Sequence, residues 1–210
     1  MSTFKIEGAK IIEGLFPESN WEELDAPKYQ QVFEKLISIE QLSSEVVDYI
    51  KNKKVRIGFH QQYKSGAGWT LFRNITLTPG ANLDDPSTLC LIIHEVFHLK
   101  QSILMRLSMR GELLAWQYQK QTYHQLTGKE IGDFGQAYPG TQKFWEELSM
   151  LSADSRDDLE KARDVMKNIA RGYRSDCLPL YPLPREFSFY LRQGKIRDAI
   201  GAVIKLVTCK

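Results

Sequence analysis

Five consecutive residues, His94-Glu95-Val96-Phe97-His98, combine two imidazoles and a carboxylate at a spacing that suits a metal ion. On a helix, residues four apart lie on one face about 6 Å apart along the axis, so both histidines can bind the same ion. Glu95 is turned by about 100° from His94, so it can contact a metal-bound water instead of the metal. The segment therefore predicts a zinc site in which Glu95 acts as general base.

The neighbourhood of the motif favours a buried helix. Asp85 is a good N-cap, Pro86 suits the first helical position, and the following residues are largely apolar as far as Gln101. The alternative is a core helix whose histidines only form hydrogen bonds. Burying two histidines and a glutamate without a metal would be costly, which favours the metal site.

A catalytic zinc usually has three protein ligands, and Glu112 is the predicted third. It lies fourteen residues after His98, and a bend between Arg106 and Arg110 could fold its helix back against the motif helix. Two small residues near Glu112, Gly111 and Ala115, could allow the two helices to approach closely. The alternative is a solvated glutamate on an exposed helix face.

His124 is the competing third ligand, since it offers a nitrogen donor. Twelve helical residues separate it from Glu112, which turns it about 120° round the helix, so both cannot face one ion if the helix is regular. We therefore favour Glu112. His60, at the end of a predicted strand, is expected to be an ordinary surface or core histidine.

His94, Glu95, His98 and Glu112 resemble, residue by residue, the gluzincin group of zincin metallopeptidases, in which a second helix supplies a glutamate ligand. The resemblance covers residues 68 to 126 and implies a zincin-like fold, Zn²⁺ and a peptide or protein substrate. It also implies that the strand before the motif helix, residues 68–78, pairs with extended substrate. The third histidine of metzincins is absent, and the thermolysin-like acidic residue four positions after the glutamate is replaced by Trp116.

Two supporting roles remain open. Gln101 lies seven residues after His94 on the same helix face and could hydrogen-bond a ligand, or be only a polar edge position. The resemblance further implies a downstream Tyr or His that stabilises the oxyanion. The candidates are Tyr173 and Tyr181, with Tyr123 or His124 as weaker ones, and a tyrosine that merely packs on the core is the alternative for each.

The apolar spacing predicts an α+β fold, mainly helical, with a small sheet preceding the motif helix. Strands are expected over residues 55–59 and 68–78. Helices are expected over residues 26–39, 44–51, 86–101, 107–126, 141–151, 155–171 and 185–207, the last of them broken near Gly194. We expect a single domain over residues 1–210, with the metal-site core at about 55–127 and a helical C-terminal part at about 140–210.

Composition argues for an ordinary globular protein. The 28 basic and 26 acidic residues give a net charge of +2, so neither nucleic acid nor a membrane is an expected partner. Cys90, Cys177 and Cys209 are widely spaced and are expected to be reduced thiols. With no apolar leader visible, the expected location is cytoplasmic; the sequence does not indicate the oligomeric state.

Two rival classes of protein share parts of the pattern. A di-iron four-helix protein would need a Glu-x-x-His pair twice, and His124 has Gln121, not a carboxylate, three residues before it. A catalytically inactive zincin-like module would bind zinc for structure or regulation. Such a module would not need Glu95, so the sequence favours a zinc-dependent hydrolase, most simply a peptidase.

Overall fold

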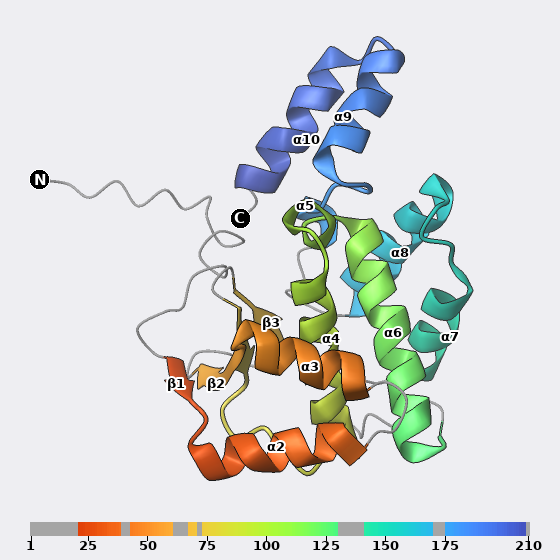
Figure 1. The fold of residues 1–210 in the computed structure, drawn as a ribbon. Coiled ribbons are helices and arrows are strands. Elements are labelled where there is room, and N and C mark those ends of the chain that lie inside the picture. Colours follow the sequence, from red (N-terminus) through yellow and green to blue (C-terminus); the bar gives the residue numbers. More distant parts are fainter. Residues whose placement is uncertain are drawn as a thin grey trace, which may run out of the picture.

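The computed structural model describes residues 21–38, 43–60, 67–70, 73–129, 141–169 and 175–208. These residues form an α+β fold, predominantly helical with one small sheet, as the sequence predicts (Figure 1). Among them, no helix combines the length and the apolar composition needed to cross a membrane.

The sheet has four short strands in the order β1-β2-β4-β3. The strands are β1 (Trp21–Glu23), β2 (Arg56–His60), β3 (Ala67–Trp69) and β4 (Asn74–Leu77). β2 and β4 run parallel in the centre, while β1 pairs antiparallel with β2 and β3 antiparallel with β4. The sequence did not predict β1, because three residues are too few to show an alternating pattern.

The prediction of one long strand over residues 68–78 is wrong. The chain reverses between β3 and β4: the Arg73 amide donates to the Thr70 carbonyl at 3.1 Å, and the Thr70 amide donates to the Asn74 carbonyl at 2.9 Å. Arg73 has a φ of 61°, in the left-handed region. No glycine or proline marks this turn, and the apolar alternation continues through both arms, so the pattern alone looked continuous.

The helices begin and end close to their predicted positions. Gly128 (φ 67°) ends the helix that follows the motif, and Gly194 (φ 70°) separates the last two helices, as the sequence suggested. The helices are α2 (Ala26–Ser38), α3 (Ser43–Lys53), α4 (Pro86–Lys100), α5 (Ile103–Arg106), α6 (Met109–Thr127), α7 (Thr141–Met150), α8 (Arg156–Ile169), α9 (Leu183–Arg192) and α10 (Ile196–Thr208), with a 3₁₀ turn, η1 (Ser175–Cys177).

The motif helix α4 is the centre of the structure, because hydrophobic clusters lie on two sides of it. On one side Ile92, Ile93 and Val96 pack with the sheet and with α2 and α3. On the other side Cys90 joins a cluster formed largely by α6, α7 and α8. Burial on both sides explains why the α4 sequence is apolar almost all round.

The cysteines correct one expectation. Cys90 is a free, buried thiol, and burial raises its pKa to about 12. Cys177, however, is disulfide-bonded, whereas all three cysteines were expected to be reduced. Spacing along the chain does not reveal which cysteines a fold brings together. The odd number and wide spacing of the cysteines therefore did not predict their redox state.

Candidate metal centre

Helix α4 presents His94 and His98 on one face. Its start is fixed as predicted: the Asp85 carboxylate accepts a hydrogen bond from the Ser87 amide at 2.9 Å, and Pro86 occupies the first turn. Both histidines are buried, 5% and 2% exposed. A rigid, buried helix thus holds the two imidazoles one turn apart.

The chain reversal after α4 brings Glu112 opposite the histidines. Helix α5 is a single turn, and Ser108 then caps α6 by accepting a hydrogen bond from the Gly111 amide at 3.1 Å. A Cβ on Gly111 would lie 2.0 Å from the Met105 carbonyl oxygen, so only glycine permits this close return. The predicted bend is therefore present, and Gly111 permits the close approach of α5 as well as of Gln101 at the end of α4.

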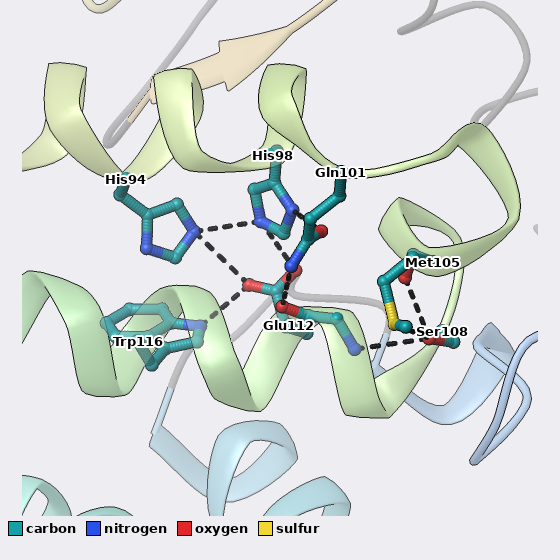
Figure 2. A network of polar contacts seen from close by, with 8 residues as sticks. His94, His98, Gln101, Met105, Ser108, Glu112 and Trp116 are labelled. Carbon is teal, nitrogen blue, oxygen red and sulfur yellow. Dashed lines mark hydrogen bonds and ion pairs between the residues drawn. The ribbon is translucent and has the colours of Figure 1, made fainter. Parts of the chain in front are cut away.

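His94, His98 and Glu112 converge on one point between the two helices (Figure 2). The two Nε2 atoms are 3.1 Å apart, His98 Nε2 lies 3.2 Å from Glu112 Oε2, and His94 Nε2 lies 3.5 Å from Glu112 Oε1. Two ligand atoms at about 2.0–2.1 Å from a tetrahedral zinc would be about 3.3 Å apart. The separations are near that value, with each histidine facing a different carboxylate oxygen, and one ligand atom from each residue lies within 4.8 Å of the others, so the group could hold a metal ion.

Gln101 fixes the protonation of His98. Its side-chain Nε2 donates to the Gly111 carbonyl at 3.0 Å, which leaves Oε1 as the atom that faces His98 Nδ1 at 3.1 Å. Because an amide oxygen only accepts, His98 carries a proton on Nδ1, and in its neutral form the lone pair of Nε2 faces His94 and Glu112. Of the two roles considered for Gln101, the structure shows the hydrogen bond to a candidate ligand (Figure 2).

Trp116 orients the carboxylate from the other side. Its indole Nε1 donates to Glu112 Oε1 at 2.7 Å, and its ring packs edge-on against His94 with centroids 5.2 Å apart. Sequence reasoning noted Trp116 only as a departure from the thermolysin-like pattern. The available signal was its position four residues after Glu112, which places both on one face of α6.

The charges of the cluster suit a cation. Burial alone would raise the pKa of Glu112, but the facing His98 and His94 outweigh it and hold that pKa well below its usual value. Burial would likewise lower the pKa of His98, yet Glu112 raises it overall. Among the described residues Glu112 pairs with no lysine or arginine, so its compensating charge is a proton on the histidines or a bound metal ion.

Glu95 lies next to the ligands and remains available. It is 6% exposed, and no hydrogen bond or ion pair joins it to another described residue. Burial raises the pKa of its carboxyl, with the nearby Glu112 adding to this and the two histidines opposing it. A buried carboxylate with an elevated pKa and no fixed partner is suited to accept and release a proton.

Trp69 and Arg106 border the cluster on the sheet side. Trp69, in β3, lies with its ring centroid 6.3 Å from that of His98. The Arg106 guanidinium packs over Trp69 at 5.0 Å and donates to the carbonyls of Leu99 and Gln101, which end α4. The edge strand of the sheet is thus fixed beside the motif helix.

The other predicted candidates lie elsewhere. His124 is not part of the ligand cluster; it lines a surface groove between α6 and the segment that follows α7. Tyr181 is buried and donates its hydroxyl to the Asp154 carbonyl at 2.7 Å, so of its two interpretations the structure shows the tyrosine that packs on the core. Tyr123 is also buried in that core, His60 is a buried residue of β2, and Tyr173 lies outside the described residues.

Comparison of the chain with protein-family models, with curated proteins and with solved structures found no match.

Proposed function

We propose that this protein is a zinc-dependent peptidase of the gluzincin type. One observation carries the proposal: His94, His98 and Glu112 bring their ligand atoms within 4.8 Å of one another at a buried site. Two imidazole nitrogens and one carboxylate oxygen are a ligand set typical of catalytic zinc, and they leave the fourth position open. Zinc itself, as opposed to another divalent metal, is inferred from this donor set.

A zinc ion held by His94, His98 and Glu112 would supply Lewis-acid chemistry, activating a water and polarising the substrate carbonyl. Glu95 takes the proton from the attacking water and passes it to the leaving amine. Its burial beside His94 and His98, with no hydrogen bond or ion pair to another described residue, supports this role. Gln101 and Trp116 keep the ligands oriented throughout.

The edge strand β3 supports an extended peptide as the substrate. β3 pairs with β4 on one side, and no described strand pairs with its other edge. Its Trp69 is in ring contact with His98, so a peptide added along this edge would pass close to the metal position. Main-chain hydrogen bonds to such an edge bind peptides with little dependence on side chains. Tyr173 remains the candidate for stabilising the oxyanion.

A second candidate is a zinc-binding module without hydrolytic activity. The observation that favours it is burial: His94, Glu95, His98 and Glu112 are all between 2% and 6% exposed. A structural zinc site is closed in this way, whereas a catalytic site must admit substrate. In such a module Glu95 would have no catalytic task.

Hydrolysis of a broad peptide library by the zinc-loaded protein separates the two candidates. The peptidase proposal predicts cleavage by the parent and a loss of at least about a hundredfold in Glu95→Gln, at unchanged zinc content, as expected for loss of general-base catalysis. Glu146→Gln, an exposed glutamate on α7, is the matched control and retains activity. A parent that binds zinc but cleaves no peptide would favour the zinc-binding module.

A further inference from the structure

The last two helices form a hairpin that projects away from the rest of the molecule (Figure 1). Its base is anchored by Arg156 of α8, which donates to both carboxylate oxygens of Glu186 at 2.8 and 3.1 Å. The same guanidinium packs over the Phe189 ring at 4.0 Å. The hairpin is therefore held at one end, and its far end extends into solvent.

Exposed apolar side chains gather on this hairpin. Of the ten large hydrophobic residues that are exposed in the described part of the chain, six lie in α9 and α10, each between 36% and 59% exposed. They are Phe187, Leu191, Ile196, Ile200, Val203 and Ile204. A patch of this kind on a small protein marks an interaction surface.

The exposed stripe of α10 is distinct from the side that packs within the hairpin. Ile196, Ile200 and Ile204 follow one another at four-residue spacing and share one face of the helix. Ala199 and Leu206, which are buried, lie on the adjoining face. Packing of α10 against α9 therefore leaves the three isoleucines between 49% and 59% exposed.

The hairpin is also basic. It carries five basic and two acidic residues, a net charge of +3, compared with +2 for the whole chain. All five basic side chains are exposed, whereas one of the two acids, Glu186, is buried against Arg156. The basic residues are Arg185, Arg192, Lys195, Arg197 and Lys205.

This combination of charge and exposure decides between the possible partners. In a symmetric pair each hairpin of net charge +3 would meet an identical one, and Asp198 is the only exposed acid of the hairpin to offset the repulsion. An anionic lipid surface instead offers apolar chains for the isoleucines and phosphate groups for the basic side chains. We propose that the α9–α10 hairpin docks the protein on an anionic membrane surface.

Docking lays the isoleucine stripe in the interfacial region, and the exposed basic residues contact the lipid headgroups. Phe187 and Leu191 extend the apolar contact onto α9. This arrangement needs no spanning helix and no occupant of the metal centre. It is therefore independent of the proposed peptidase activity.

Sedimentation with phosphatidylcholine vesicles, with and without phosphatidylglycerol, tests the proposal on the full chain. The parent is expected to bind only the vesicles that contain phosphatidylglycerol, and to dissociate as salt is raised. Arg197→Glu lowers the partition coefficient by about fivefold for each unit of charge removed, and Ile200→Ser combined with Ile204→Ser abolishes binding. Lys143→Glu and Met150→Ser, exposed positions on α7, are the controls and bind like the parent.

Far-UV circular dichroism of each variant checks that α10 stays folded, and sedimentation velocity gives the oligomeric state. Three results would overturn the proposal: no binding to phosphatidylglycerol vesicles, equal binding to both kinds of vesicle, or a dimer that Ile200→Ser dissociates. The last would assign the stripe to a second copy of the chain. Glu95→Gln is expected to bind vesicles like the parent, so failure here is distinct from failure of the peptidase proposal.

Discussion

Replacing Gln101 with alanine is expected to weaken zinc binding although Gln101 is not a ligand. The side chain accepts from His98 Nδ1 at 3.1 Å and donates to the Gly111 carbonyl at 3.0 Å, so it joins the end of α4 to the start of α6. Its loss leaves the buried Nδ1–H unsatisfied, at a cost of about 1–3 kcal/mol. Partners of this kind are typically worth about 10–100-fold in metal affinity, which is the loss we predict.

Competition with a chromophoric chelator measures the zinc Kd of each variant. Gln117→Ala is the matched control, because the Gln117 side chain likewise donates to backbone carbonyls, those of Leu148 and Leu151, away from the candidate ligands. Gln101→Glu keeps an acceptor for His98 and is expected to retain most of the affinity. If Gln101→Ala binds zinc as tightly as the parent, the inferred orientation of His98 is wrong.

Three further variants test other contacts. Trp116→Phe removes the donor to Glu112 but keeps a ring, so zinc affinity should fall about tenfold in the same chelator assay, and an unchanged Kd would refute the orienting role. Gly111→Ala should lower the free energy of unfolding in urea by about 1–3 kcal/mol through its backbone clash, whereas Gly201→Ala, in open space, should raise it slightly. In the metal-free protein the raised pKa of Glu95 means that its ionised form destabilises the folded state. This destabilisation is absent below the ordinary pKa of 4.5 and grows as pH rises through the raised pKa. Glu95→Gln should therefore stabilise the metal-free protein at neutral pH but not in acid, and equal effects at both pH values would contradict this assignment.

The sequence predicted the parts of the candidate site that depend on the residue pattern within a single helix. The Asp85 cap, the helical spacing of His94 and His98, and the position of Gln101 all follow from the period of one helix. Glu112 required one further step, a chain reversal, and small Gly111 was a correct sign that something approaches closely there. What it approaches, the Met105 carbonyl, depends on tertiary packing and was not predictable from spacing.

The features that the sequence did not predict depend on contacts between distant segments of the chain. Tyr181 was a candidate for catalysis because its loop could return over a cleft, but the fold takes it to the Asp154 carbonyl. The β3–β4 turn has none of the residues that usually mark a reversal. The hydrogen bond from Trp116 to Glu112 depends on side-chain rotamers, which periodicity does not specify.

The net charge of the chain does not describe how its charges are distributed. A value of +2 suggested no attraction to a membrane, yet it averages a basic C-terminal hairpin with a slightly acidic remainder. Steering and docking depend on where charges lie and on the apolar surface beside them. The expectation of no membrane partner and the docking proposal are competing hypotheses, and the vesicle experiment decides between them.

Zinc stoichiometry tests the central claim most directly. Elemental analysis of the purified protein, after zinc loading and removal of free metal, should find a single zinc per chain in the parent and in Glu95→Gln. Glu112→Ala should lose most of it, since a ligand is removed. A parent that takes up no zinc, or a Glu112→Ala variant that binds it as tightly as the parent, would contradict the assignment of His94, His98 and Glu112 as the metal site.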